Sequence, residues 1–143
     1  MESQAKRILS LYRYFMWCNT MKNYFYASII EANIEKQKLK DQSLSFMVYW
    51  YAGLWVVVEG WFHLNELGVH DTQIDGLLKE TDKTKILHDF RNNVLHYQSN
   101  TYGKRFINML ESGQQNVAWI CNLHEGFIRF FNATMFERIE KDT

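Results

Sequence analysis

The most restrictive feature of the sequence is its complete lack of proline in 143 residues, together with only 7 glycines. Antiparallel sandwiches and barrels need many tight turns, and those turns draw on proline and glycine. Long helices joined by a few loops need neither residue. Hydrophobic residues make up 47% of the chain and aromatic residues 16%, which is ample material for one core. The sequence therefore predicts a single all-α domain over residues 1–143, a bundle of four or five helices.

Apolar residues recur at helical spacing along most of the chain. Polar capping residues and glycines mark where the helices are expected to begin and end. Gly68 and Gly113 are expected to stop the helices that precede them. The predicted helices cover residues 3–40 as one helix or a broken pair, Asp41 or Ser43 to Leu67, Ile74–Leu78 after Thr72, Asp82 to a polar cluster at Gln98–Thr101, Phe106–Leu110, and Asn116 onwards.

Basic and acidic residues balance at 16 each, so no overall charge favours nucleic acid or a membrane surface. Residues 59–78 contain four acidic residues and no lysine or arginine, whereas residues 79–105 are richer in basic residues. A local basic patch near the middle of the chain and ordinary solvated charge both remain open. The basic residues of this stretch are Lys79, Lys83, Lys85, Arg91, Lys104 and Arg105.

The expected location is the cytoplasm. The stretch Leu44–Phe62 is apolar and only Glu59 in it is charged, but its polar and glycine residues suit a buried central helix better than a membrane span. Charged residues interrupt the apolar positions near the N-terminus, so no signal peptide is expected. Cys18 and Cys121 lie far apart and outside any metal-ligand spacing, which predicts reduced thiols in a cytosolic protein.

The segment Arg91–His96 contains the residues that most favour a function. Arginine supplies a permanent forked cation for phosphate oxygens. Histidine titrates near neutrality and can move the proton of a ribose 2′-hydroxyl. Asn92 and His88 lie four and eight residues before His96 and are expected to share its helical face. The pattern indicates a site for a phosphodiester, and an ordinary surface arginine beside a helix-end histidine is the alternative.

This segment resembles the motif of the HEPN superfamily, which comprises helical-bundle ribonucleases of toxin–antitoxin, abortive-infection and CRISPR systems. Their motif is an arginine and a histidine separated by about four to six residues, often with a polar residue directly after the arginine. Arg91, Asn92 and His96 match this motif in its four-residue spacing. The resemblance consists of this short motif and of a helical architecture over most of the chain, and it implies a HEPN-like bundle.

The resemblance also implies a homodimer in which two motifs face each other and form one composite active site. RNA cleavage would need no metal or cofactor, because the 2′-hydroxyl attacks the adjacent phosphate and leaves a cyclic phosphate and a 5′-hydroxyl. His96 would be the general acid or base, Arg91 would stabilise charge on the phosphate, and Asn92 would orient the pair. The residues around the motif that are expected to contact substrate are Lys85, His88, Tyr97, Lys104 and Arg105.

The implied setting is bacterial defence, with an antitoxin protein or RNA as a further partner. A toxin branch of the superfamily carries a tyrosine two residues after the motif histidine, to which an antitoxin partner attaches nucleotides. In this chain Tyr97 follows His96 immediately and Gln98 occupies the second position. Modification of Tyr97 by such a partner is therefore not expected.

Three other interpretations are kept beside this one. A catalytically inactive helical module could bind RNA or a protein partner through the same groove. Glu59, His63, Glu66 and His70, spaced by four, three and four residues, could bind a metal on an unbroken helix, although Gly68 is expected to break the helix and a polar stripe is favoured. Glu59 is also a candidate accessory acid for the motif.

Aromatic clusters near the N-terminus, Tyr12–Phe15 and Tyr24–Tyr26, could stack bases beside cations. At helical spacing, a place in the core or in a dimer interface is the simpler expectation for them. His124 and Glu125 have no partner that the sequence reveals, so no chemical role is expected for either residue.

Overall fold

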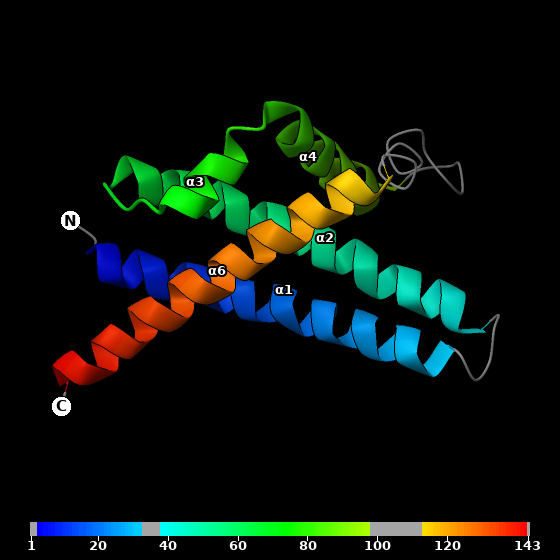
Figure 1. Cartoon of the computed structure of the whole chain (residues 1–143), viewed down its shortest axis with the longest axis horizontal. Helices are drawn as coiled ribbons and strands as arrows, with labels where there is room; N and C mark the ends of the chain where they lie inside the picture. Colours follow the sequence, from blue (N-terminus) through cyan, green and yellow to red (C-terminus); the bar gives the residue numbers. More distant parts are fainter. Residues whose placement is uncertain (1–2, 33–37, 98–112, 143) are drawn as a thin grey trace.

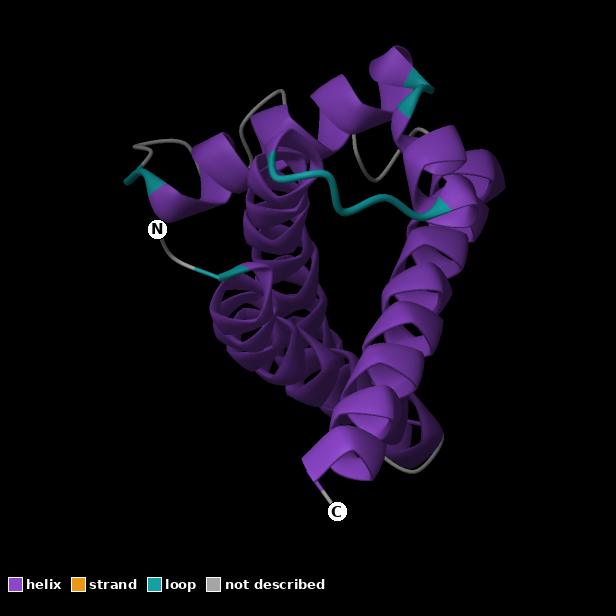
Figure 2. Ribbon diagram, turned by 90° about the vertical axis from the view of Figure 1, so that its left-hand side faces the viewer, coloured by secondary structure: helices purple, strands orange, loops and turns teal. Residues whose placement is uncertain are grey.

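Every element in the described part of the chain is a helix and no strand occurs there, which confirms the predicted all-α class. The computed structural model describes residues 3–32, 38–97 and 113–142. The helix predicted over Phe106–Leu110 lies outside these described residues. The described helices are α1 (Gln4–Ala32), α2 (Lys38–Glu66), α3 (Thr72–Leu78), α4 (Thr81–Leu95) and α6 (Gly113–Asp142) (Figure 1; Figure 2).

The long helices α1 and α2 run antiparallel and lie side by side, and α6 crosses this pair diagonally (Figure 1). Helix α4 packs against α2, and α3 packs against α6. Phe131 of α6 stacks on Phe15 of α1 with 5.2 Å between ring centroids. Phe127 of α6 meets Trp61 of α2 edge-on at 5.7 Å. Aromatic side chains therefore join α6 to both helices of the pair.

The core is buried between all five described helices and is rich in large rings. Burial of such apolar side chains supplies most of the favourable free energy of folding. Its largest fully buried side chains are Trp50, Trp61, Phe90, Phe127, Phe131, Leu54, Leu64, Ile74, Leu87, Ile120, Leu123 and His124.

Two glycines of α2 lie against α1. A Cβ atom at Gly53 would lie 3.4 Å from Cys18 Cβ, and one at Gly60 would collide with the side chain of Leu11. At Gly53 the added atom would also lie 3.6 Å from Cys18 Cα, so the backbones of α1 and α2 approach closely there. This close approach places α1 side chains beside the polar residues near the C-terminal end of α2.

The chain leaves the helical conformation at Gly68, two residues after the end of α2, as predicted. The φ of Gly68 is +85°, in the left-handed region that favours glycine. The amide of Gly68 donates to Asn65 O and that of Val69 donates to Leu64 O, both at 3.0 Å. The chain therefore leaves the axis of α2 before His70.

Four predicted helix starts lie too late in the chain, by one to three residues for α3, α4 and α6 and by three residues (Asp41) or five residues (Ser43) for α2. Helix α2 begins at Lys38, before Asp41 and Ser43, because the residues Lys38–Lys40 are good helix formers. Helix α4 follows Glu80, whose side chain forms no capping hydrogen bond.

Helices α6 and α3 also begin earlier in the chain than predicted. Helix α6 begins at Gly113 and places Asn116 inside the helix, where it is buried. The cap of α3 is Asp71, which accepts a hydrogen bond from Ile74 N at 3.0 Å. In each case a favourable residue near a helix end does not by itself select the terminal residue.

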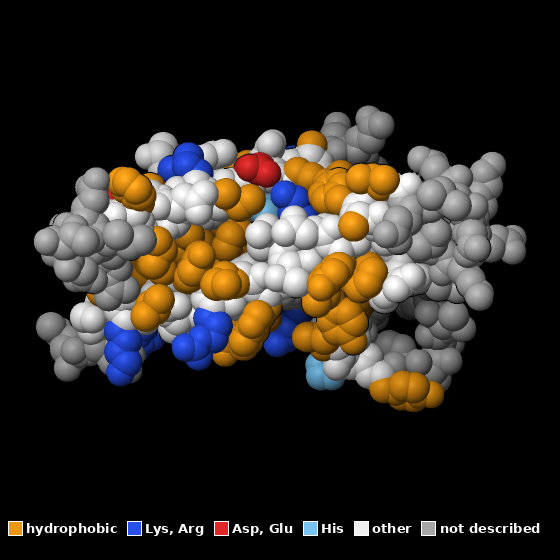
Figure 3. Space-filling model, turned by 90° about the horizontal axis from the view of Figure 1, so that it is seen from below, with side chains coloured by type: hydrophobic (Ala, Val, Ile, Leu, Met, Phe, Trp, Pro, Cys, Tyr) orange, Lys and Arg blue, Asp and Glu red, His pale blue; other side chains and the backbone are white. Residues whose placement is uncertain are grey.

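The surface retains many large apolar side chains, and hydrophobic side chains gather beside lysines and arginines on the face seen in Figure 3. None of the described helices is long and apolar enough to cross a membrane. Cys18 is buried, Cys121 is partly exposed, and both are free thiols, as the sequence predicts. The exposed apolar side chains of α1 are Leu9, Tyr14, Met16, Trp17, Tyr24, Tyr26, Ile29 and Ile30.

His124 is a fully buried side chain whose two ring nitrogens both have partners. Trp50 Nε1 donates to His124 Nδ1 at 3.0 Å, so the proton of the neutral ring lies on Nε2. His124 Nε2 then donates to Asn19 Oδ1 at 2.9 Å. Burial, helped by the charge of Lys22, lowers the pKa of His124 to about 3. The ring is a neutral part of the core, with partners that the sequence did not reveal.

We expect acid to destabilise the protein through His124. In the unfolded chain this histidine has an ordinary pKa of 6.5, and in the folded chain its pKa is about 3. The unfolded chain therefore takes up a proton that the folded chain does not, and stability falls as the pH drops from 6.5 toward 3. Between pH 7 and about pH 4.5, urea unfolding should show a loss of about 2 kcal/mol from this residue.

The His124→Gln variant should lack this part of the pH dependence, whatever its absolute stability. His63→Gln is the control, because the side chain of His63 is 68% exposed and should leave the pH dependence unchanged. The same acid-induced loss in His124→Gln and in the parent protein would contradict the assignment.

Candidate functional site

The segment Arg91–His96 occupies the last turn of α4 and the residue that follows it. Arg91 and Asn92 are half-buried, whereas His96 is exposed. His96 has φ −111° and ψ 131°, an extended conformation that ends the helix. His96 is therefore the C-terminal capping residue of α4, as its predicted place at the helix end requires.

The buried side of α4 fixes the direction in which Arg91 points. Leu87 and Phe90 are fully buried, and the ring of Phe90 meets that of Tyr51 on α2 at 5.7 Å. His88 packs edge-on against Trp55 of α2 at 4.9 Å. With these contacts on one side of α4, Arg91 faces the groove between α2 and α1.

Asn92 links Arg91 to His88 through hydrogen bonds. Arg91 Nη1 donates to Asn92 Oδ1 at 2.8 Å, and because a guanidinium only donates, this contact sets the orientation of the amide. Asn92 Nδ2 then donates to His88 Nε2 at 3.2 Å. The proton of neutral His88 lies on Nδ1, 3.4 Å from Asp89 Oδ1. Asn92 therefore connects the guanidinium of Arg91 to the ring of His88 and restrains it.

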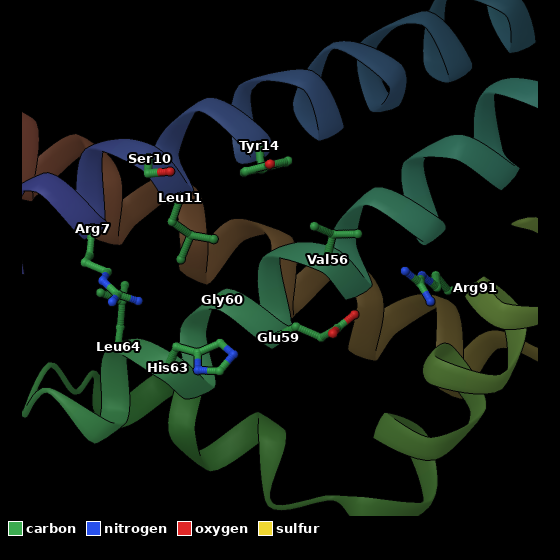
Figure 4. A pocket seen from close by; sticks show the side chains of 10 residues that line it. All are labelled: Arg7, Ser10, Leu11, Tyr14, Val56, Glu59, Gly60, His63, Leu64 and Arg91. Atoms are coloured by element: carbon green, nitrogen blue, oxygen red, sulfur yellow. The ribbon is translucent and has the colours of Figure 1, made fainter.

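Arg91 lines a cavity of about 370 Å³ at the junction of α1, α2 and α4. In Figure 4, Arg7 enters it from α1, Glu59 and His63 come from α2, and Arg91 comes from α4. The carboxylate of Glu59 extends toward the Arg91 side of the cavity (Figure 4). The remaining lining residues are Ser10, Leu11, Tyr14, Val56, Gly60 and Leu64.

This cavity combines two guanidinium groups with one carboxylate and one imidazole. Two arginines provide permanent, forked donors for the oxygens of a phosphate. Carboxylate and imidazole are the side chains that most often transfer protons in enzymes. Arg91 Nε is buried and has no hydrogen-bond partner in the described part of the chain. The arrangement suits binding of an anion beside groups capable of acid–base chemistry.

The sequence did not point to Arg7 or Ser10 as site residues. Both residues reach the cavity because of the antiparallel register of α1 and α2. This register sets Leu11 against Gly60 and brings Arg7 toward His63. No local pattern reveals that register. Glu59 was a candidate accessory acid, and it lines the same cavity as Arg91.

The other predicted substrate contacts are not gathered at this cavity. Lys85 and Tyr97 are exposed, Tyr97 at 95%, and neither lines the cavity. His88 reaches the site only through Asn92. Lys104 and Arg105 lie outside the described residues.

The stripe Glu59–His70 is interrupted as expected. Helix α2 ends at Glu66, and after Gly68 the ring of His70 lies 3.4 Å from Asp75 Oδ2. His63 Nδ1 lies 3.8 Å from Glu66 Oε2. Across the described ranges, no three side chains of the metal-ligating types gather closely enough to hold an ion.

Comparisons with protein-family models, with curated proteins and with solved structures find no match to this chain. The resemblance to the HEPN superfamily therefore rests on Arg91, Asn92 and His96 and on the helical architecture. The geometry of the cavity is a separate observation, because it includes Arg7 and Glu59 from other helices.

We expect Asn92→Ala to destabilise the protein by about 1–2 kcal/mol, because it removes hydrogen bonds to both Arg91 and His88. Asn93→Ala is the matched control. It makes the same chemical change one position along α4, outside this chain of hydrogen bonds, and should cost clearly less. Urea unfolding of the two variants measures the difference, and equal losses would show that the Asn92 hydrogen bonds contribute nothing.

Proposed function

We propose that this protein is a HEPN-like endoribonuclease that cleaves RNA without a metal, from an active site shared by two copies of the chain. The observation that carries the proposal is the orientation of Arg91. Asn92 holds its guanidinium at 2.8 Å, at a cavity that also receives Arg7. Two cations in one cavity suit a phosphodiester. A place in toxin–antitoxin or antiphage defence follows from the family resemblance alone.

In the proposed reaction, the ribose 2′-oxygen bonds to the adjacent phosphorus as the bond from phosphorus to the 5′-oxygen breaks. The proton of the 2′-hydroxyl goes to a general base, and the leaving 5′-oxygen receives a proton from a general acid. His96 serves in one of these roles. Arg91 stabilises the charge that develops on the phosphoryl oxygens. Asn92 is a positioning residue, since it acts through Arg91.

The shared site is supported by the separation of the two motif side chains. Arg91 lines the cavity, whereas His96 is exposed beyond the end of α4 and is not among the described residues that line it. A second chain related by a two-fold axis would add its own exposed His96 near the Arg91 of the first. This arrangement also doubles the positive charge offered to RNA, which suits a chain with no net charge.

We expect the purified protein to cleave single-stranded RNA in the presence of EDTA and to leave a 2′,3′-cyclic phosphate and a 5′-hydroxyl. Arg91→Ala and His96→Ala should each lower the initial rate by about 100- to 10,000-fold. Electrophoresis of end-labelled RNA measures the rate, and phosphatase and kinase treatment identifies the ends. His70→Ala, beyond the end of α2, is the control and should keep the parent rate.

The variant His63→Ala distinguishes a shared site from one built within a single chain. If His96 transfers the proton, His63→Ala retains most of the activity, whereas a one-chain mechanism would depend on His63. Cleavage at the parent rate by His96→Ala would contradict the proposal.

We expect the protein to sediment as a dimer at micromolar concentration. Arg91→Ala and His96→Ala should each be nearly inactive alone, and a mixture of the two should recover part of the parent rate. Recovery is expected because a mixed dimer contains one site with an intact Arg91 from one chain and an intact His96 from the other. A monomer with full activity, or a mixture with no recovery, would contradict the shared site.

The second candidate function is a catalytically inactive module that binds RNA or a protein partner. Two observations favour it. Within one chain, Arg91 already donates a hydrogen bond to Asn92, and His96 is not among the described residues that line the cavity. RNA binding that depends on Arg91, together with no cleavage under any ionic condition, would select this function.

A further inference from the structure

A second cavity, of about 420 Å³, continues along the groove between α1 and α2. Its volume lies in the range typical of small-molecule sites, about 300–1,000 Å³. Its lining is formed almost entirely by apolar and aromatic side chains, with no charged residue among them. The lining residues are Tyr14, Trp17, Cys18, Met21, Tyr49, Gly53 and Val56.

Three aromatic rings of this cavity are unusually exposed. Trp17 and Tyr49 are each 58% exposed and Tyr14 is 46% exposed, whereas the core tryptophans Trp50 and Trp61 are at most 1% exposed. Tyr14 and Trp17 meet edge-on with 5.3 Å between ring centroids. Large parts of these three rings are therefore left uncovered on the surface of the helix pair.

The floor of the cavity is uncharged. Gly53 lies against Cys18, so no side chain fills the groove from α2 at that point. The thiol of Cys18 is buried, its Sγ donates to Trp50 O at 3.4 Å, and burial raises its pKa far above neutral. A neutral thiol and a glycine offer no counter-ion, and they leave room for a flat apolar group.

The aromatic cavity and the cavity of Arg91 are parts of one groove, because Tyr14 and Val56 line both. Along α1, Arg7 and Trp17 stand about 15 Å apart at about 1.5 Å per residue. That distance corresponds to about four stacked nucleotides at about 3.4 Å each. One end of the groove carries Arg7 and Arg91 beside Glu59, and the other end is aromatic.

We propose that the aromatic end, formed by Tyr14, Trp17 and Tyr49, is a nucleobase-binding subsite for single-stranded RNA whose phosphates contact Arg7 and Arg91. This inference rests on the proposed function. A nucleotide strand joins flat bases to anions at regular intervals, which matches rings next to arginines. A purely apolar helix or acyl chain would cover the rings and leave the two arginines opposite apolar surface. The subsite extends the RNA contacts beyond the Arg91–His96 motif.

The test uses the full chain carrying His96→Ala, so that cleavage does not interfere, and a fluorescein-labelled oligouridine of about eight nucleotides. Trp17→Ala in this background should weaken binding, measured by fluorescence anisotropy, by about 5- to 100-fold, the effect of one lost base–aromatic stack. Tyr24→Ala is the matched control, since Tyr24 is 53% exposed on the same helix and does not line the groove. The control should bind like its parent.

Two further measurements separate stacking from damage to the fold. Trp17→Phe keeps a flat ring and should restore most of the affinity lost in Trp17→Ala. An oligonucleotide of the same length without bases should bind weakly to the parent, and its affinity should not change in Trp17→Ala. Loss of affinity for both oligonucleotides together would show that the substitution disturbs the fold or the charge, and the subsite would be rejected.

The failures of the two proposals are distinguishable. If Trp17→Ala binds oligouridine as tightly as its parent, the subsite is wrong, and cleavage by the unmodified protein still stands. If binding depends on Trp17 but the unmodified protein cuts no RNA, the subsite stands as part of a binding module. If Trp17→Ala turns a dimer into a monomer without changing the affinity for RNA, the groove is an interface between copies and the subsite is rejected.

Discussion

The close antiparallel packing of α1 on α2 is the contact on which the candidate site depends. Gly53 and Gly60 of α2 face Cys18 and Leu11 of α1 across this contact. A larger residue at Gly60 would displace the end of the Leu11 side chain, whereas a Cβ at Gly53 would only reach van der Waals contact with Cys18. The packing brings polar side chains of α1 and α2 into one cavity. The same packing leaves a groove along the pair, so the cationic and aromatic cavities have a common structural origin.

Helix α4 adds the third wall of the cavity, and its position is set by apolar contacts. Leu87 and Phe90 bury one side of the helix and leave Arg91 directed toward α2. Hydrogen bonds within α4 then restrict the arginine, with Asn92 between its guanidinium and His88. Packing thus positions the backbone, and a short polar network sets the side chain. An arginine restrained before a ligand arrives loses less conformational entropy on binding.

Two histidines of this chain show how the surroundings of a side chain decide whether it can exchange protons. His124 is enclosed by the core, receives a hydrogen bond from Trp50, and has a pKa lowered to about 3 by burial. It is therefore neutral near pH 7 and contributes packing and hydrogen bonds. His96 is exposed just past the end of α4. Only an accessible imidazole can exchange protons with a substrate, and His96 meets this requirement whereas His124 does not.

The sequence by itself determined the helical class and the stop at Gly68, because these follow from composition, periodicity and the conformational preference of glycine. The choice of Arg91, Asn92 and His96 rests on the resemblance to the HEPN motif and stays a prediction. The sequence misplaced several helix starts, since capping residues only favour certain positions. Tertiary structure alone decided that Arg7 and Glu59 lie at the same cavity as Arg91, and that Trp17 and Tyr49 line one groove. Those associations join residues far apart in the sequence, and they depend on the register of packed helices, which no local pattern encodes.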